Sequence, residues 1–197
     1  MQASRLDRRA VVKRLLFDRR DLLVVAGLGA PAWDVAAAGD HPLDFPLWGA
    51  MGGAAMVGLG LALAQPSRKV LVITGDGEML MGLGSLATIS AQHPRNLRII
   101  VLDNERYGET GLQHTHTALG TDLAAVALGC GFPCAHMLES DEQIEFLRTQ
   151  IQHFEDLFLA VIKIALTDDP PVLPPRDGAF LKNRMRGALL GPRVMFQ

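Results

Sequence analysis

The sequence predicts an α/β protein with a doubly wound, mostly parallel sheet and helices on both of its faces. Residues 70–74 and 97–102 are runs of mostly aliphatic and β-branched side chains, as strands that are buried on both faces require. Two further runs of this kind occupy residues 21–26 and 157–164. Segments with helical spacing separate the runs, and strands that alternate with helices in this way build parallel sheets.

Each element of the first half has its own local signal. Residues 6–17 place apolar side chains at helical spacing with charges on the opposite side, which predicts a surface helix. The strand at 21–26 ends in a glycine-rich turn, and ligands usually bind at such strand ends. A short helix is expected at 32–38 and a longer one at 52–65.

The second half alternates in the same way. A helix is expected over residues 78–90, and another over 121–128, which begins with the capping pair Thr-Asp. A weaker strand signal covers residues 132–137. The start Ser-Asp-Glu-Gln predicts a helix over 140–153, because it matches a capping box.

Length and composition indicate a single domain. The 197 residues are expected to form a domain over 1–168 and a tail over 169–197 that packs on the domain or on a partner. The net charge of −2 gives no reason to expect a nucleic-acid partner. Two cysteines make no disulfide framework, which suits the cytoplasm, where we expect the protein to lie. The apolar stretch 50–64 is short for a bilayer span, so no membrane association is expected.

The expected helix at 52–65 is unusually rich in glycine. Gly52, Gly53, Gly58 and Gly60 fall within it, and an interior glycine costs a helix roughly 1 kcal/mol relative to alanine. Close approach of the backbone to a neighbouring element or to a cofactor would offset that cost. Tight packing against the protein's own sheet would do the same, and the sequence does not choose between them.

Two polar side chains follow neighbouring strands at the same edge of the predicted sheet. The strand at 70–74 breaks at Gly75-Asp76-Gly77, and the strand at 97–102 is followed closely by Asn104. The ends of adjacent parallel strands align, so a carboxylate and an amide oxygen should meet near a helix N-terminus. Such a site suits Mg²⁺ that carries a diphosphate. An Asp that merely caps the helix is the alternative for an isolated Gly-Asp-Gly, and Asn104 favours the metal.

These motifs resemble those of thiamine diphosphate (ThDP) enzymes. Gly75-Asp76-Gly77 with Asn104 downstream resembles the ThDP motif, and Trp48 to Gly52 resembles the segment that precedes it in the pyruvate decarboxylase group. The run from Asp103 to Gln113 looks most like phosphonopyruvate and sulfopyruvate decarboxylases. The resemblance covers about residues 20 to 165 and implies the diphosphate-binding domain of the ThDP fold. Asp103 departs from the pattern, because it stands where the family usually has an Asn.

The resemblance also implies roles for single residues. Asp76, Asn104 and the backbone carbonyl of Arg106 would bind Mg²⁺. The cofactor would be held by the close approach of Gly75 and Gly77 and by further groups. The backbone N–H groups of Glu78 and Met79 would bind the diphosphate, and the Gly49 carbonyl would accept a hydrogen bond from the aminopyrimidine. Met51 would lie under the bend between the two rings. Tyr107 would line the pocket or merely pack.

The segment beyond Asn104 and the tail hold candidates for substrate chemistry. In the related decarboxylases the segment that contains Gln113 closes over the active site, so His114 or His116 could bind an anionic substrate or move a proton. Exposed loop histidines are more often inert, and that alternative stays open. Arg184 and Arg186 could reach a sulfonate or phosphonate, although a solvated basic tail explains them equally well.

The resemblance further implies a partner subunit. The family's activating Glu belongs to a pyrimidine-binding domain, and only about fifty residues precede Trp48, which is too few for such a domain. We therefore expect the beta subunit of a two-subunit, Mg²⁺-dependent 2-oxoacid decarboxylase. An alpha subunit would supply the Glu within a hetero-oligomer such as α2β2 or larger.

Three other functions remain compatible with these motifs. A carboligase of the acetolactate synthase type shares them, and so does the beta subunit of a 2-oxoacid oxidoreductase. The oxidoreductase usually needs clustered cysteines, whereas this chain has only Cys130 and Cys134. A cofactor-binding scaffold subunit without turnover is the non-enzymatic alternative. The 2-oxoacid itself is not determined by the sequence, because the pocket is expected to be shared with the partner.

Overall fold

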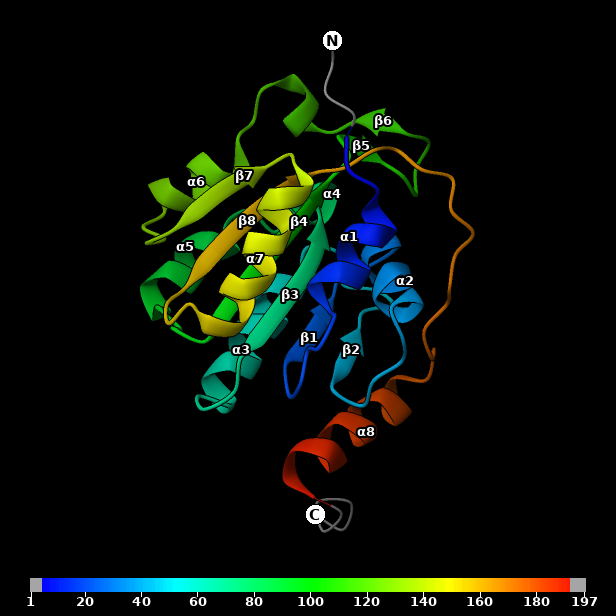
Figure 1. Ribbon diagram of the computed structural model, residues 1–197, viewed down its shortest axis with the longest axis vertical. Helices are drawn as coiled ribbons and strands as arrows, with labels where there is room; N and C mark the ends of the chain where they lie inside the picture. The colour runs from blue at the N-terminus through cyan, green and yellow to red at the C-terminus, as the bar shows by residue number, and fades with distance from the viewer. Residues whose placement is uncertain (1–4, 192–197) are drawn as a thin grey trace.

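The computed structural model describes residues 5–191 and confirms the α/β fold. The main sheet has six parallel strands in the order β2-β1-β3-β4-β8-β7 (Figure 1). The inner strands are buried along nearly their whole length, which explains their mostly apolar sequences, although the buried Arg98 interrupts β4. The six strands are β1 Leu23–Ala26, β2 Asp44–Pro46, β3 Val70–Gly75, β4 Leu97–Asp103, β7 Ala135–Leu138 and β8 Phe158–Lys163.

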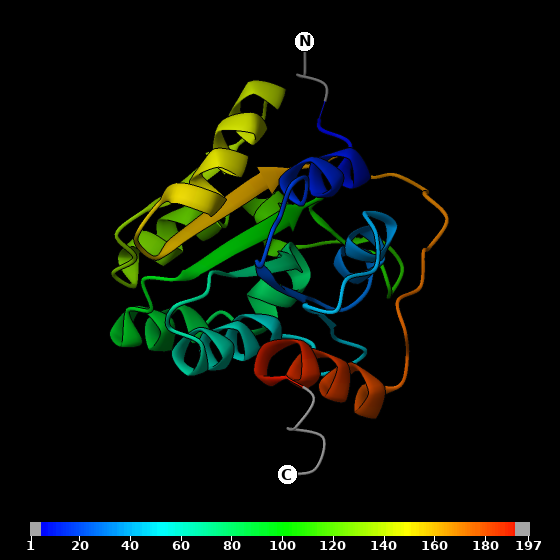
Figure 2. The same ribbon diagram turned by 60° about the horizontal axis from the view of Figure 1, so that its bottom comes forward.

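Helices cover both faces of the sheet, as the doubly wound class predicts (Figures 1 and 2). One face carries α1 Arg8–Leu15, α2 Ala30–Ala37 and α7 Asp141–His153. The other carries α3 Ala54–Ala64, α5 Ser85–Gln92 and α6 Leu123–Gly129. Within residues 5–191 no helix is both long and apolar enough to cross a membrane.

Side chains alternate between the two cores along each inner strand. In β1, Leu23 and Val25 join the core under α3, whereas Val24 and Ala26 join the core under α1 and α2. The predicted caps also form. The Asp122 side chain accepts hydrogen bonds at the start of α6, and Ser140 forms a capping box at the start of α7. The local signals therefore place most elements within a few residues.

The expected helix at 78–90 is wrong as one element. The chain instead forms a short helix α4, Asp76–Met81, followed by α5 after a break at residues 82–84. At the break the Gly82 backbone lies so close to the Gly52 carbonyl that an added Cβ atom would stand 2.2 Å from that oxygen. Only glycine fits there, and α4 ends at this close approach.

Three small elements were not expected from the sequence. The edge strand β2 is only three residues long and ends at Pro46, which a strand edge tolerates. A two-stranded hairpin joins β5, Arg106–Tyr107, to β6, Gln113–His114, and a short 3-10 helix, His116–Leu119, follows it. The hairpin lies at the end of the molecule toward which β3 points (Figure 1).

The four glycines in and before α3 have different surroundings. Gly58 packs against β3 so tightly that an added Cβ atom would meet Val72 at 2.2 Å, whereas Gly60 has open space around it. Gly52 and Gly53 precede the helix, which begins at Ala54. At Gly58 the structure therefore supports packing against the protein's own sheet.

The described part of the C-terminal segment packs on the domain. Residues 165–177 run along its side, and α8, Gly178–Leu190, packs against β2 (Figures 1 and 2). The indole of Trp48 donates to the Pro175 carbonyl at 2.7 Å, and the Arg184 guanidinium pairs with Asp40 at 2.7 Å. The helix α8 was not expected from the basic composition of this segment. The division of the chain at residue 168 stays a prediction.

Candidate functional site

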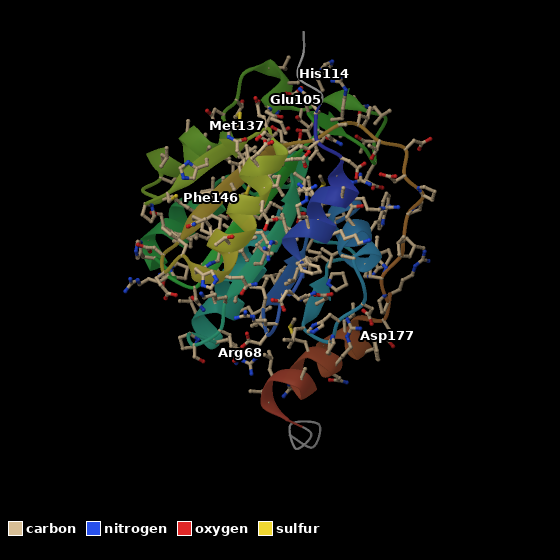
Figure 3. The ribbon with its side chains drawn as sticks, in the orientation of Figure 1. Arg68, Glu105, His114, Met137, Phe146 and Asp177 are labelled. Carbon is tan, nitrogen blue, oxygen red and sulfur yellow. The ribbon has the colours of Figure 1, made fainter. Side chains whose placement is uncertain are left out.

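The carboxyl ends of β1, β3, β4 and β8 surround a cavity of about 410 Å³. From β1 the chain passes outward to β2 and then returns to β3 on the other side, so a topological switch point lies between β1 and β3. Asp76, Asn104 and Arg106, the three residues that the resemblance assigns to a metal, all line this cavity. Glu105 and His114 lie at the same end of the molecule, opposite Arg68 (Figure 3).

Asp76 is a buried carboxylate that accepts a short hydrogen bond from one hydroxyl group and has a second hydroxyl nearby. Only 2% of the residue is exposed, and Thr115 donates a hydrogen bond to its Oδ2 atom at 2.6 Å. The Thr117 hydroxyl lies 3.4 Å from the same oxygen. Burial, opposed by the Thr115 hydrogen bond and reinforced by the Asp103 charge, raises the pKa of the Asp76 carboxyl to about 6. A bound cation would stabilise the charge that burial disfavours.

Asn104 stands in a tight turn directly after β4. Its Oδ1 atom accepts the backbone N–H of Arg106 at 2.9 Å, and Asp103 Oδ1 accepts the N–H of Glu105 at 3.0 Å. Glu105 itself adopts a left-handed backbone with φ 62°. The side chains of Asp103 and Asn104 thus hold two consecutive backbone amides of this turn. They stabilise a left-handed conformation at Glu105 that residues other than glycine rarely adopt.

Asp103, which departs from the family pattern, has hydrogen-bond partners for both of its carboxylate oxygens. The residue is buried, and its Oδ2 atom accepts from the Lys163 ammonium at 2.7 Å. The Thr117 hydroxyl donates to its Oδ1 atom at 2.8 Å. Asp103 therefore receives hydrogen bonds from β8 and from the segment after β6.

The Glu78 side chain has a structural role of its own at this site. Its buried carboxylate accepts hydrogen bonds from the Thr74 hydroxyl at 2.8 Å, the Leu28 N–H at 3.1 Å and the Ala54 N–H at 3.3 Å. Burial raises the pKa of this carboxyl, and the hydrogen bonds oppose the shift. One side chain thereby joins the loop after β1, the end of β3 and the start of α3.

Comparison with known proteins agrees with this geometry. Residues 29–161 match the thiamine pyrophosphate enzyme C-terminal TPP-binding domain. The chain belongs to this family. Thiamine pyrophosphate is another name for ThDP, so the family agrees with the cofactor that the motifs suggest.

Among the relatives, the chain is 44% identical to a sulfopyruvate decarboxylase subunit beta of Methanocaldococcus jannaschii, over 55% of this chain and 57% of the relative. It is 43% identical to a phosphonopyruvate decarboxylase of Streptomyces viridochromogenes, over 76% of this chain and 38% of the relative. The chain thus spans little more than half of the first relative and less than half of the second.

Among solved structures, benzoylformate decarboxylase from Polynucleobacter necessarius has the same fold, with a TM-score of 0.71 at 19% identity. The likeness covers 84% of this chain and 34% of that structure. It confirms the TPP-binding domain fold and carries no statement about substrate.

The remaining TPP-binding candidates divide into two groups. Gly77 lies close to the Tyr107 ring, from which an added Cβ atom would stand 2.8 Å away, and the Met51 methyl group would lie 3.7 Å from the same Cβ atom. Gly75, Gly77, Glu78, Met51 and Tyr107 all line the cavity, which is the placement expected for a TPP cradle. Met79 instead buries its side chain in the core, and Gly49 is exposed and does not line either cavity described here.

The two histidines occupy different surroundings. His116 lines a second, largely apolar cavity of about 560 Å³ that shares Met51, Gly77 and Tyr107 with the first. His114 lines neither of these two cavities and is in contact with the Arg106 guanidinium. Gln113 bonds to Thr110 within the hairpin loop. Of the two, His116 alone lines either cavity.

The basic residues of the tail are not part of this cavity. Arg184 pairs with Asp40, and neither Arg184 nor Arg186 lines the cavity. Arg8 does line it, although its guanidinium is paired with the buried Asp34. Sequence reasoning missed Arg8, because it lies inside an ordinary amphipathic helix.

The donor set fits the divalent ion that a diphosphate requires. A carboxylate, an amide oxygen and a backbone carbonyl from Asp76, Asn104 and Arg106 are hard oxygen ligands, which Mg²⁺ prefers. The Thr115 and Thr117 hydroxyls engage Oδ2 of Asp76. The cavity bordered by Gly75 and Gly77 leaves space beside these donors for the cofactor. This TPP-family site therefore fits both Mg²⁺ and ThDP.

Proposed function

We propose that this chain is the diphosphate-binding beta subunit of a ThDP- and Mg²⁺-dependent 2-oxoacid decarboxylase. The observation that carries the proposal is the meeting of Asp76, Asn104 and Arg106 in one cavity at the switch point of the sheet. Relatives named sulfopyruvate and phosphonopyruvate decarboxylases support a 2-oxoacid with a second anionic group as the substrate class.

In this proposal the residues of the site bind and orient the cofactor. Asp76, Asn104 and the Arg106 carbonyl hold Mg²⁺, which neutralises the diphosphate. Backbone N–H groups of Glu78 and Met79 bind the phosphates, and the Gly49 carbonyl accepts from the aminopyrimidine. Met51 and Tyr107 support the ring system. ThDP, when bound, supplies the electron sink that makes loss of carbon dioxide possible.

Hydrogen bonds around Asp76 and Glu78 would keep the site in a fixed shape. The Thr115 hydrogen bond fixes one oxygen of Asp76, so the carboxylate cannot rotate away from a bound ion. Glu78 holds the loop after β1 against β3 and so fixes the width of the cavity between them. His116, beside the second cavity, is the candidate for proton transfer to or from the substrate, and His114 is the weaker candidate.

The proposal includes an alpha subunit that carries a pyrimidine-binding domain and the activating Glu. The name "subunit beta" of the Methanocaldococcus jannaschii relative supports such a partner. Apolar side chains that line the two cavities support it as well, because Met51 and Met81 are 39% and 68% exposed. An exposed apolar surface beside a cofactor site is typical of an interface. The expected assembly is a hetero-oligomer such as α2β2 or larger.

Calorimetry of ThDP with Mg²⁺ tests the cofactor assignment. The chain is titrated alone and together with a candidate alpha subunit encoded by a neighbouring gene. Binding is expected in the mixture and is expected to disappear in Asp76→Ala. The matched control is Asp21→Ala, since Asp21 is exposed at the opposite end of the sheet. Normal ThDP affinity in Asp76→Ala would overturn the metal assignment.

Product analysis tests the reaction. The mixture is supplied with sulfopyruvate, phosphonopyruvate or pyruvate, and carbon dioxide and the organic product are measured. A decarboxylase releases one aldehyde for each carbon dioxide, whereas a carboligase joins the remaining fragment to a second carbonyl compound. Cofactor binding without any product from these acids would favour the scaffold function.

A further inference from the structure

Asp103 and Lys163 occupy paired positions at the carboxyl ends of two adjacent strands. They are register partners in the parallel pair β4 and β8, so their side chains leave the sheet on the same face. The Lys163 ammonium lies 2.7 Å from Asp103 Oδ2, and both side chains are largely buried. The residue that departs from the family pattern thus has a cation placed beside it by the register of the sheet.

Lys163 also holds the next acidic residue of the turn. Its ammonium lies 2.9 Å from Glu105 Oε1, and the Arg5 guanidinium lies 2.7 Å from Glu105 Oε2. Glu105 is the residue with the left-handed backbone. Lys163 and Arg5 therefore hold the side chain of Glu105, whose backbone is strained, from both carboxylate oxygens.

Polar contacts connect Asp103 to Asp76 through two threonine hydroxyls. Its Oδ1 atom accepts from the Glu105 N–H at 3.0 Å and from the Thr117 hydroxyl at 2.8 Å. The Thr117 hydroxyl lies 2.8 Å from the Thr115 hydroxyl, which donates to Asp76 at 2.6 Å. A continuous chain of polar contacts connects Lys163 to the carboxylate that lines the cavity.

We propose that Lys163 is a positioning residue for the turn formed by residues 103–106, and that it replaces the neutral hydrogen bonding of the usual Asn with an Asp–Lys pair. The proposal rests on the proposed function, since this turn supplies Asn104 and Arg106 to the cation. Without Lys163 the buried Asp103 carboxylate lacks a countercharge and moves toward water. That movement breaks its bond to the Glu105 N–H and releases the turn.

Hydrogen exchange of the Glu105 amide tests the claim without any cofactor. In Lys163→Met this amide should exchange about tenfold faster or more, while the amide of Val72 in the sheet changes by less than about threefold. Lys163→Arg should restore protection, because a guanidinium can reach both carboxylates. Asp103→Asn combined with Lys163→Met should restore it too, because the amide oxygen still accepts from Glu105 and no buried charge is left unpaired.

Cation affinity provides the second readout. Mn²⁺ is titrated in the presence of ThDP, with the chain alone and with the candidate alpha subunit. Lys163→Met should weaken Mn²⁺ binding by about tenfold or more, as residues that orient metal ligands do. Both rescue variants should return to within about threefold of the wild type. The matched control is Lys69→Met, which removes a lysine paired with Glu155.

The outcomes separate the positioning role from the function. Unchanged exchange at Glu105 and unchanged Mn²⁺ affinity in Lys163→Met would overturn the positioning role. Equal acceleration at Glu105 and Val72 would also overturn it, because Lys163 would then act on global stability alone. If the wild-type chain binds no Mn²⁺ with ThDP under either condition, the proposed function fails, and the exchange of Glu105 still decides whether Lys163 orders the turn.

Discussion

The carboxylate of Glu78 accepts a hydrogen bond from the backbone N–H of Leu28, with 3.1 Å between Oε2 and the nitrogen. The two residues are fifty positions apart, and their contact joins the start of α4 to the loop after β1. The same oxygen accepts the Thr74 hydroxyl at 2.8 Å. The two loops on either side of the switch point are thus fixed to one another by a single buried side chain.

Gly27→Ala should disrupt this connection. An added Cβ atom would stand 1.9 Å from Glu78 Oε2, so the carboxylate has to move and lose its partners. We expect the free energy of unfolding to fall by about 1–3 kcal/mol, as for other overpacked sites. Urea denaturation measures the loss, and calorimetry with ThDP and Mg²⁺ should show weaker binding.

Gly129→Ala is the control for this variant, because nothing lies within 4 Å of its added Cβ atom. If Gly27→Ala proves as stable as the wild type, then Glu78 is not held between the two loops.

Two glycines of α3 should respond in opposite directions to the same change. Gly58→Ala forces a Cβ atom to within 2.2 Å of Val72 and should lower the free energy of unfolding by about 1–3 kcal/mol. Gly60→Ala meets open space and should raise it by about 0.5–1 kcal/mol, because alanine is the better helix former. Thermal denaturation of the two variants side by side checks the pair. Equal effects at both positions would mean that α3 does not lie on β3 as described.

The sequence predicted the parts of the site that follow directly from strand ends. Asp76 and Asn104 come immediately after buried apolar runs, and parallel pairing brings such ends together without any long-range knowledge. The same reasoning predicted all four inner strands, because burial on both faces leaves a strong apolar signal. It failed at residues 82–84, where the helix breaks because of a close contact with Gly52 that no local pattern encodes.

The supporting side chains were missed for a physical reason. Thr115 and Thr117 reach Asp76 across about forty positions, and Lys163 reaches Asp103 across sixty. Threonine and lysine are common in any surface loop or strand end, so neither carries a signal of its own. The unusual Asp103 was the only available hint, since a buried carboxylate needs a countercharge. Finding which lysine supplies it required the register of β8.

Thr115→Val should weaken cation binding. Valine keeps nearly the same shape but removes the hydroxyl that donates to Asp76 at 2.6 Å. We expect the dissociation constant for Mg²⁺ in the presence of ThDP to rise about tenfold, as for other residues that orient metal ligands. Thr149→Val is the control, because that hydroxyl bonds only within α7. A cation affinity equal to that of the wild type would show that Asp76 is oriented without this hydroxyl.

Asp76→Asn should abolish Mg²⁺ binding and yet stabilise the ligand-free protein at neutral pH. Burial, with a contribution from Asp103, raises the pKa of the Asp76 carboxyl from 3.8 to about 6. Between these two values the folded state holds more protons than the unfolded state, so stability falls as the pH rises through this window. Above pH 6 the charged carboxylate therefore destabilises the fold, and a neutral Asn removes that cost.

The expected difference is about 1–3 kcal/mol in favour of Asp76→Asn at pH 8 and close to zero near pH 4. Urea denaturation across this range, without divalent ions, measures it. Adding Mg²⁺ with ThDP should reverse the order, because the ligands stabilise only a protein that binds them. Asp21→Asn, which changes an exposed carboxylate, is the control. A variant that is less stable than the wild type at pH 8 would show that the Asp76 charge is already compensated in the ligand-free chain.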